Sequence, residues 1–577
     1  MRFSSNTKSC LKAVTLTMLI SLLPSVPVMS QNFNDEPDMP QTDVFGEELS
    51  APDHRSDNAF LRRYSSGKDE LSHLSLTVNS RIRRKLVFNM SFTGNAGSGD
   101  YAPFWFTSNR QGLSTTEPSG LMMRLGLNGS MHLPSQFHFS YGMDMAVAAG
   151  YQSDFYLHQI YVDAGYKWFD LSVGAKERWG ELVNPSLSSG GLTWSGNSRP
   201  IPQIRLEVPE FTRLGILGGL VSLKGHIAYG WYKDNDWRED QAIKYSNPPE
   251  YTDHILHHSK SMFIRIGDTE RFPLEFIAGL EMYAQFGGTR HNIRLNPDEP
   301  LTESVDLPHD AQSYWKILLP VNKEGEQSKE NGNTLGSWHL ALGLTLDKWQ
   351  YRLYYEHFYE DHSSMLGIEN KPDLGGHRNL ISFGMKRNWL DGLFGLEINA
   401  PEGLPFSNIV FEVLNTRGQC GPILIDGNTI INNGDPIIKE VVDGKDDMYS
   451  HAIYSSYTNF GYANGNPTLI SPAYNKDGDL YFRSNRVLMY HLGIDGQITE
   501  RLDYRLLTTH ATHWGTYNRP FHDKESITSV LMECFYHQKE SYSWRFGVSI
   551  GADFSSSKLL GDNKGIMFTI SKLWRML

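Results

Sequence analysis

Ser543–Ser555 reads Ser-Trp-Arg-Phe-Gly-Val-Ser-Ile-Gly-Ala-Asp-Phe-Ser, and this stretch decides the fold. Every second residue from Trp544 to Phe554 is apolar, whereas Arg, Gly, Ser and Asp occupy the positions between them. Successive side chains of a β-strand point to opposite faces of its sheet, so the stretch predicts a strand with one apolar and one polar face. Strands of soluble proteins average about five or six residues, and a strand that crosses a membrane needs about ten. This stretch therefore has the length of a membrane strand.

The same alternation recurs along the chain from Lys85 onwards. It is clear in Phe137–Ala149, Phe155–Lys167 and Phe169–Arg178. It is weaker in five further segments: His339–Asp347, Tyr351–Tyr359, Arg378–Lys386, Leu502–His513 and Gly565–Leu573. The polar faces carry Gly, Ser, Arg and Asp, which suit a water-filled barrel lumen.

The connections between these segments differ in length. Short turns are expected at residues 133–136, 167–169, 347–349, 386–392, 499–501 and 539–541. Long loops are expected at 94–119, 181–199, 234–259, 287–336, 361–377 and 416–479. Short turns on one side and long loops on the other are typical of outer-membrane barrels, whose short turns are periplasmic. The sequence thus predicts an all-β chain, a transmembrane antiparallel β-barrel of about 18 strands with both termini periplasmic.

Tryptophans occur at three of the expected short turns. Trp168, Trp349 and Trp389 suit the aromatic girdle at a membrane interface. Ordinary packing in a protein core is the alternative interpretation of each.

The N-terminus has the pattern of a signal peptide. Basic residues precede an apolar core, Ala13–Leu23, which is too short to span a bilayer as a helix. A small-residue stretch then ends at Ser30, so we expect cleavage between Ser30 and Gln31. Export followed by insertion into the cell outer membrane is the localisation that we expect.

Three parts of the chain are therefore predicted. Residues 1–30 form the signal peptide, and residues 31–84 form a small polar periplasmic extension in which a short helix is left open. Residues 85–577 form the barrel with its long extracellular loops. Beyond residue 30 the sequence contains no apolar run as long as a transmembrane helix.

Charge and cysteine content exclude some functions. The formal net charge of −12 argues against a nucleic-acid partner. After signal-peptide cleavage only Cys420 and Cys534 remain, which excludes a disulfide-rich scaffold. Whether these two cysteines pair is left open.

The loop between the strands Phe169–Arg178 and Ile204–Val208 is the first candidate binding site. It carries aromatic rings, which can stack on sugars, and planar donors, which can reach hydroxyls and carboxylates. Its candidate carbohydrate-binding residues are Arg178, Trp179, Trp194, Asn197 and Arg199. A loop whose tryptophans only pack at the barrel rim is the alternative interpretation.

A second candidate region is Tyr449–Tyr481, in which aromatic residues alternate with Asn and Gly. Tyr454 and Tyr457 are its candidate carbohydrate-binding residues. A loop that folds these rings into the barrel mouth as a plug is the alternative.

The sequence contains no catalytic or phosphate-binding motif. His254, His257 and His258 are interpreted as part of a solvated loop, and Asn475–Asp479 as a Gly/Asp turn rather than a calcium loop. The pairs Glu177/Glu181 and Glu356/Glu360 match a glycosidase only by chance spacing. We predict no catalytic residue, no metal site and no cofactor.

Three motifs resemble a known family. They are Leu187–Gln203, the pair of segments Ala102–Trp105 and Asn109–Gly112, and Tyr454–Thr468 with its Gly465-Asn466-Pro467. Together they resemble the Wzi-like capsule assembly proteins of Gram-negative bacteria, in the form common in Bacteroidetes, over roughly Asn89 to the C-terminus. The resemblance implies an outer-membrane barrel that binds capsular polysaccharide or exopolysaccharide at the cell surface, as a lectin in capsule attachment and organisation and not as an export pore. It also implies periplasmic helices, which would suit residues 31–84, but it transfers no sugar site residue by residue.

Three functions follow, in order of preference. The first is a lectin that tethers surface polysaccharide, and the second is a channel for small solutes or oligosaccharides. The third is an outer-membrane hydrolase. The expected partners are surface polysaccharide and outer-membrane lipid, and we expect a monomer.

Overall fold

The computed structural model describes most of the chain from residue 83 to residue 576. It leaves out residues 245–248, 268–271, 294–303, 319–331, 361–367, 373–378, 384–389, 419–423, 426–430, 433–434, 437–440, 443–446, 539–543 and 556–558. The predicted signal peptide, residues 31–82 and Cys420 lie outside the described residues, so these predictions stay untested. Cys534 is a free cysteine.

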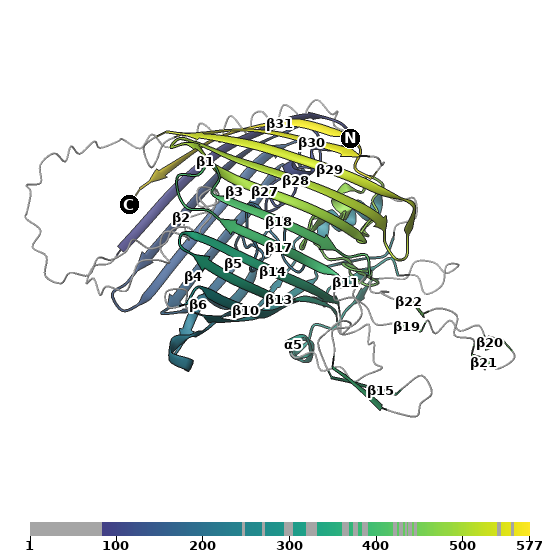
Figure 1. The fold of residues 1–577 in the computed structure, drawn as a ribbon. Helices are drawn as coiled ribbons and strands as arrows, with labels where there is room; N and C mark the ends of the chain where they lie inside the picture. The colour runs from purple at the N-terminus through teal and green to yellow at the C-terminus, as the bar shows by residue number, and fades with distance from the viewer. Residues whose placement is uncertain are drawn as a thin grey trace, which may run out of the picture. The chain divides into compact units, whose positions relative to one another are not determined.

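Eighteen strands pair in one sheet, each antiparallel to its neighbours (Figure 1). They are β1 (Arg83–Ser98), β2 (Gly120–His132), β3 (Phe137–Ala149), β4 (Phe155–Tyr166), β5 (Phe169–Ala175), β6 (Gln203–Leu214), β7 (Val221–Trp231), β9 (Leu256–Gly267), β10 (Leu274–Phe286), β13 (Asn333–Leu346), β14 (Trp349–Glu360), β17 (Gly392–Asn399), β18 (Asn408–Asn415), β27 (Val487–Thr499), β28 (Leu502–Gly515), β29 (Pro520–His537), β30 (Trp544–Ser555) and β31 (Asn563–Arg575). Each strand pairs with the next in this order, and β31 pairs with β1, so the sheet closes into a barrel. The predicted fold class and the predicted eighteen strands are confirmed.

Short elements occupy the loops. The helices are α3 (Phe104–Thr107), η1 (Ile216–Gly219), α4 (Asn235–Ile243), α5 (Ala311–Leu318) and η2 (Pro472–Tyr474). The short strands are β8 (Tyr251–Asp253), β11 (Thr289–His291), β12 (Val305–Asp306), β15 (Ile368–Pro372), β16 (Asn379–Phe383), β19 (Leu424–Ile425), β20 (Ile431–Asn432), β21 (Asp435–Pro436), β22 (Val441–Val442), β23 (Ser450–His451), β24 (Ser455–Ser456), β25 (Thr458–Asn459) and β26 (Tyr462–Ala463). In the described part of the chain, no helix has the length and apolarity needed to cross a membrane.

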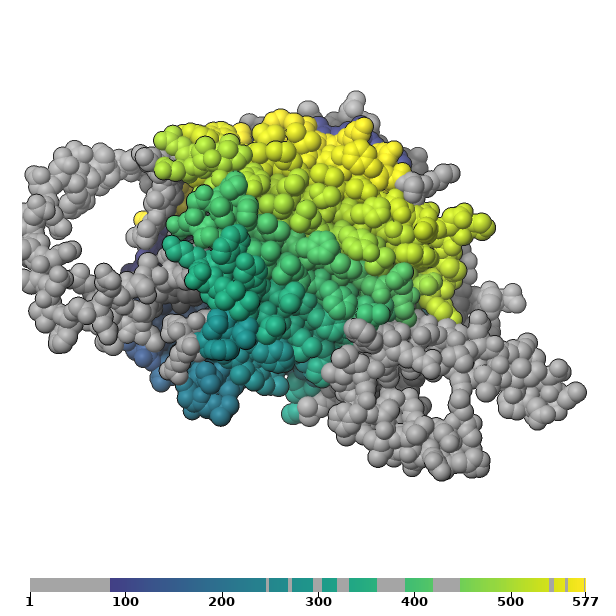
Figure 2. All heavy atoms as spheres, in the orientation of Figure 1, coloured from purple at the N-terminus to yellow at the C-terminus, as the bar shows by residue number. Residues whose placement is uncertain are grey.

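The barrel has its apolar face outside and its polar face inside. On β30, Phe546 and Ile550 are 43% and 57% exposed, whereas Ser549 and Asp553 are 2% and 0% exposed. A soluble protein shows the opposite arrangement, because water drives apolar side chains inward. Figure 2 shows the outer side chains of successive strands packed side by side, in colours that follow the chain order. The barrel is therefore of the outer-membrane type, with lipid-facing residues outside.

The long loops and the short turns lie at opposite ends of the barrel, as predicted. One predicted strand, Arg378–Lys386, is wrong: its described residues, Asn379–Phe383, form β16, which pairs with β15 in a separate two-stranded sheet and not with the barrel. The strand that follows β14 is β17, and residues 400–407, not 386–392, form the short connection to β18. The alternation in Arg378–Lys386 misled because a loop hairpin has the same period of two as a barrel strand.

Two of the predicted girdle tryptophans lie at the short-turn end. Trp168 connects β4 to β5, is 42% exposed, and stacks on Phe169 with ring centroids 3.8 Å apart. Trp349 begins β14 and stacks near Tyr351 at 6.2 Å. Trp389 lies outside the described residues.

The lipid-facing side of β4 allows a prediction of how much an arginine at different depths in the membrane destabilises the barrel. Ile160 lies near the middle of β4 and is 48% exposed, and Phe155 lies at the loop end of the same strand. We expect Ile160→Arg to lower the free energy of unfolding by about 2–4 kcal/mol, and Phe155→Arg by about 0–1 kcal/mol, because the cost of arginine falls towards the interface.

Urea titrations of barrel refolded into lipid vesicles measure both values. The folded fraction is read from the faster migration of unheated barrel on gels. Equal losses for the two variants would contradict the placement of β4 across the bilayer.

Candidate functional site

Three long loops fold into the barrel from one end, and we call them the plug: residues 99–119, 176–202 and 447–486. Their side chains are largely buried, including Leu192 and Tyr449, both 0% exposed. The plug therefore fills space that the polar inner faces of the strands would otherwise line with water.

Carboxylates of the barrel wall bind the plug through its backbone. Glu412 on β18 is 0% exposed and accepts hydrogen bonds from Ser188 Oγ at 2.6 Å and Ser189 N at 2.7 Å. Glu356 on β14 is 2% exposed, and its Oε1 accepts from two successive amides at 2.9 and 3.0 Å, those of Leu192 and Thr193. A buried carboxylate needs such donors, and a hydrogen bond to a charged group is stronger than a neutral one.

Cationic and imidazole groups of the wall bind the same loop from another side. Arg505 Nη1 donates to the carbonyl of Ser186 at 2.9 Å, and His491 Nε2 lies 2.7 Å from the carbonyl of Leu187. In the first loop, Arg110 forms an ion pair with Glu533 at 2.7 Å. The plug is thus fixed to strands on several sides of the barrel.

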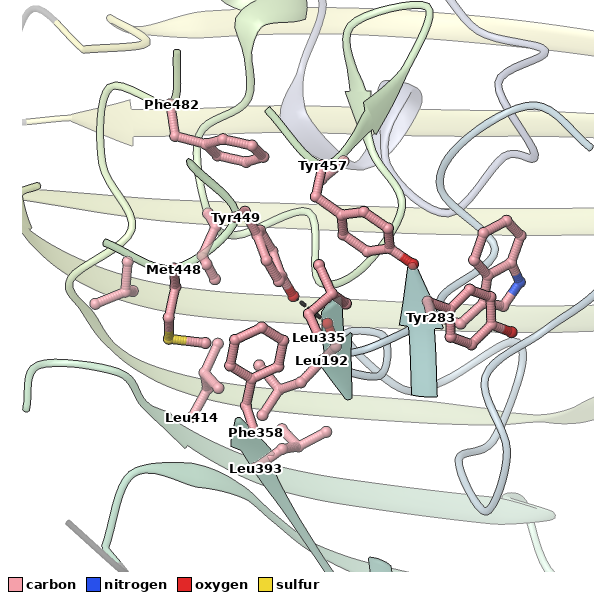
Figure 3. Close-up of a cluster of buried hydrophobic side chains, with 14 of the residues drawn as sticks. Leu192, Tyr283, Leu335, Phe358, Leu393, Leu414, Met448, Tyr449, Tyr457 and Phe482 are labelled. Carbon is pink, nitrogen blue, oxygen red and sulfur yellow. Dashed lines mark hydrogen bonds between the residues drawn. The ribbon is translucent and has the colours of Figure 1, made fainter. Parts of the chain in front are cut away.

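An apolar cluster completes the contact between plug and wall (Figure 3). Its plug members include Leu192, Met448, Tyr449, Tyr457 and Phe482, and its wall members include Tyr283, Leu335, Phe358, Leu393 and Leu414. Figure 3 shows the hydroxyl of Tyr449 directed at Leu192, to whose carbonyl it donates a hydrogen bond. The aromatic-rich second region of the sequence therefore folds into the barrel, as in the plug alternative to carbohydrate contact.

The predicted tryptophans contact protein groups in this structure. Trp194 is 5% exposed, stacks on Tyr283 at 5.2 Å with an interplanar angle of 8°, and donates from Nε1 to the carbonyl of Arg178 at 3.3 Å. Trp179 lies so close to Gly196 that a Cβ atom there would stand 2.0 Å from its ring. Gly196 is therefore needed for close approach rather than for a turn.

The predicted polar residues of the first loop are also engaged. Arg178 forms an ion pair with Glu207 at 3.2 Å. Asn197 donates to the carbonyl of Ala463 at 3.0 Å. The guanidinium of Arg199 lies between the rings of Tyr156 and Phe460, at 4.1 and 3.8 Å from their centroids. Burial lowers the pKa of Arg199 from its ordinary value.

The two predicted tyrosines are buried in the plug. Tyr457 is 0% exposed and donates to the carbonyl of Thr193 at 3.0 Å, and Tyr454 is 2% exposed. The structure thus brings Trp194, Tyr454 and Tyr457 together in one cluster. Their role in carbohydrate binding stays a prediction, but in this conformation their rings pack against protein.

A surface of which the sequence indicated only the edge, at Tyr481, lies at the loop end of the barrel. We call it the rim cluster, and it consists of Arg417, Tyr481, Arg483, Arg486, Trp514 and Arg519. The guanidinium of Arg519, 62% exposed, lies 5.6 Å from the Tyr481 ring centroid and pairs with Asp479. The guanidinium of Arg417 lies 5.4 Å from the Trp514 ring.

Backbone contacts hold the members of the rim cluster together. The carbonyl of Arg486 accepts from Trp514 N at 3.0 Å, and Arg486 Nε donates to the carbonyl of Arg417 at 3.2 Å. Arg483, 39% exposed, pairs with Asp477 at 2.5 Å. Guanidinium groups and aromatic rings at one exposed place can bind hydroxyls, carboxylates and sugar faces.

The residues of the rim cluster come from segments that lie far apart in the sequence, so no single motif contains them. Asn475–Asp479 is the Gly/Asp turn that the sequence predicted, since Asn475 Nδ2 donates to the carbonyl of Asp479 at 2.7 Å and Gly478 has a φ of 87°. Arg417 and Trp514 lie far from this turn in the sequence. Only the pairing of β18 with β27 and of β27 with β28 brings these segments together.

The histidine group is placed differently from the prediction. His254 is in a loop and exposed, as expected. His257 and His258 are buried on β9 at 1% and 0% exposure, so their placement in a solvated loop is wrong. They alternate across the barrel wall: His257 lies 5.5 Å from the inner Tyr283 ring, and His258 lies 4.5 Å from the ring of Tyr229.

Glu177 and Glu181, whose spacing the sequence analysis attributed to chance, each form an ion pair with a different cation. Glu177 pairs with Arg124 at 2.7 Å and Glu181 pairs with Lys224 at 2.6 Å. Burial would raise the pKa of Glu177, but the charge of Arg124 and hydrogen bonds from His158 and Arg124 lower it to about 2. A carboxyl group with so low a pKa is unsuited to be a general acid.

Comparisons with known proteins find similar structures but no family. No family model matches the chain, and no curated protein matches it. Among solved structures, it is similar to Wzi, described as a carbohydrate-binding β-barrel involved in group 1 capsule assembly in Escherichia coli, at 12% identity over 84% of this chain and 83% of that one, with a TM-score of 0.48. It is also similar to OccK3 (OpdO) of Pseudomonas aeruginosa, at 11% identity over 86% and 96% of the two chains, with a TM-score of 0.41. Similarity at this level identifies neither a family nor a function.

The contacts of Glu412 predict that this residue keeps the plug in place. In Glu412→Ala, the amide of Ser189 loses a buried charged acceptor, which costs about 1–3 kcal/mol. We expect the barrel to fold, the plug to become sensitive to protease, and the ion conductance in planar bilayers to rise.

Glu500→Ala is the matched control, because Glu500 is exposed in the turn between β27 and β28 at the other end of the barrel. Protection and conductance equal to those of the wild type in Glu412→Ala would show that the plug does not depend on this carboxylate.

Proposed function

We propose that this protein is a non-enzymatic, monomeric outer-membrane lectin that binds a surface polysaccharide at the loop end of its barrel. One observation carries the proposal: an anchored plug folds into the barrel, while arginines and half-buried aromatic rings meet at its outer end. Both features lie on the side of the long loops, which face the cell exterior in outer-membrane barrels.

The plug favours binding over passage. Its backbone is bound by Glu356 and Glu412 of the wall, and its aromatic cluster reaches strands β10, β13, β14, β17 and β18. A channel for oligosaccharides would need these contacts to open. The channel alternative is therefore less well supported than the lectin.

The rim cluster has the chemistry for an acidic glycan. Its guanidinium groups can pair with uronic-acid carboxylates in a bidentate manner, and the Tyr481 and Trp514 rings can stack on sugar faces. Asp477 and Asp479, which pair with Arg483 and Arg519, can accept hydrogen bonds from sugar hydroxyls. In this proposal Trp194 and Arg199 stabilise the plug beneath the glycan instead of touching it.

Glycan binding by rim variants tests the proposal. The mature protein in detergent is titrated with the surface polysaccharide of its own cell, with polygalacturonate as a uronic-acid polymer and with dextran as a neutral polymer. We expect the double variant Arg483→Ala/Arg519→Ala to weaken binding to the acidic polymers roughly tenfold, because it removes two charge-assisted contacts. Added salt is expected to weaken wild-type binding, because exposed charges are screened.

Arg501→Ala is the matched control, since Arg501 is exposed at the opposite, short-turn end. Trp194→Ala separates the two candidate sites, because Trp194 lies in the loop of residues 176–202, which contributes no residue to the rim cluster. Unchanged binding by the double variant, with loss of binding in a stably folded Trp194→Ala, would contradict the rim cluster as the site. It would favour the loop between β5 and β6, which the sequence predicted. Absence of glycan binding together with ion conductance would favour the channel.

A further inference from the structure

Three side chains in the barrel wall form a group with metal-ligand chemistry. Glu281, His339 and Glu356 are 2%, 4% and 2% exposed, and one ligand atom of each lies within 4.8 Å of the others. Two carboxylates and one imidazole are ligands that zinc accepts in proteins. The residues are far apart in the sequence, so their spacing gives no motif.

Strand register brings the three together. They lie on the adjacent strands β10, β13 and β14, which are side by side in Figure 1. His339 pairs directly with Glu356 across β13 and β14, and Glu281 is two residues beyond the partner of His339 on β10. Residues at these positions share one face of the sheet, and here that face is the inner one.

The shorter of the two His339–carboxylate distances matches shared ligation of one ion as well as an ion pair. His339 Nε2 lies 3.3 Å from Glu281 Oε2 and 3.9 Å from Glu356 Oε1, yet Nε2 has no hydrogen-bond partner. Two ligand atoms about 2.0–2.1 Å from a tetrahedral zinc ion are separated by about 3.3 Å. The Glu281–His339 separation has this value.

A second observation points to a missing ligand. Glu356 Oε1 accepts the amides of Leu192 and Thr193, whereas Glu356 Oε2 is buried without a hydrogen-bond partner. An ionised carboxylate oxygen in a buried site is costly unless a donor or a cation reaches it. Two carboxylates and one neutral imidazole would together balance the charge of a bound divalent cation.

From this geometry we infer a zinc-type divalent metal site formed by Glu281, His339 and Glu356 in the barrel wall. The ion would bind a carboxylate oxygen of Glu356, whose Oε1 also accepts the Leu192 and Thr193 amides. It would fix the carboxylate that holds the plug and link three strands to the loop of residues 176–202. Metal binding would then stabilise the plugged form by mass action. The site does not depend on glycan binding.

Metal content and melting temperature test the site. The mature protein in detergent is stripped with a chelator, dialysed with zinc chloride and analysed by elemental mass spectrometry, with calcium and magnesium chlorides in parallel. We expect about one zinc ion per chain, little calcium or magnesium, and a higher melting temperature with zinc, as for an imidazole-containing structural site. Cobalt in place of zinc is expected to give visible absorption bands of a low-coordinate site.

Glu356→Gln best separates metal binding from plug anchoring. Its amide oxygen can still accept from Leu192 and Thr193, while the anionic ligand is lost. His339→Gln removes the imidazole, and His522→Gln, at an exposed position on β29, is the control for adventitious binding by histidine. We expect Glu356→Gln and His339→Gln to fold, to lose the bound zinc and to lose the zinc-dependent rise in melting temperature.

Zinc content equal to that of the wild type in both ligand variants would overturn the site, as would a wild-type protein that retains no zinc after dialysis. Preferential calcium binding would also overturn it, because calcium takes oxygen ligands rather than imidazole.

Discussion

The pairing of β1 with β31 is the interaction on which the rest of the structure depends. It runs from Val87, opposite Arg575, to Ser98, opposite Lys564, and joins the first strand of the barrel to the last. In a bilayer no water can satisfy an open strand edge, so each unpaired backbone group would cost several kcal/mol. Closure removes both edges and allows the apolar faces of all eighteen strands to point outwards.

Closure of the barrel also encloses a polar interior, which the plug occupies. Strands that are apolar outside are polar inside, and a barrel of this size encloses more space than its own side chains fill. Here the inner carboxylates are used as acceptors for loop amides: Glu412 binds Ser189, and Glu356 binds Leu192. The plug in turn supplies aromatic rings such as Tyr449, which pack against the few apolar side chains that face inwards. Wall and plug therefore satisfy many of each other's buried polar groups.

This mutual dependence explains why residue composition singled out loops that the structure places inside the barrel. Trp194, Asn197 and Arg199 stand out in the sequence because they are aromatic or have several donors. The same properties that suit a sugar also suit a buried loop, in which a ring must stack and each donor must find a carbonyl. Asn197 finds its acceptor at Ala463, 266 residues away, and no local pattern could show this. The exposed guanidinium group of Arg519 lies instead beside the half-buried ring of Tyr481, the last residue of the second candidate region, and Trp514 and Arg519 belong to a segment without a conspicuous motif.

The sequence by itself determined the barrel class, the number of strands and the end at which the long loops lie, because the period of two and the spacing of turns are local properties of the chain. It did not distinguish a loop hairpin from a barrel strand at Arg378–Lys386, since the two share that period. Only the tertiary structure decided which loops fill the lumen, which side chains remain exposed, and that Glu281, His339 and Glu356 meet. Those outcomes depend on strand register and on contacts between distant segments, and neither is encoded in the spacing of residues along the chain.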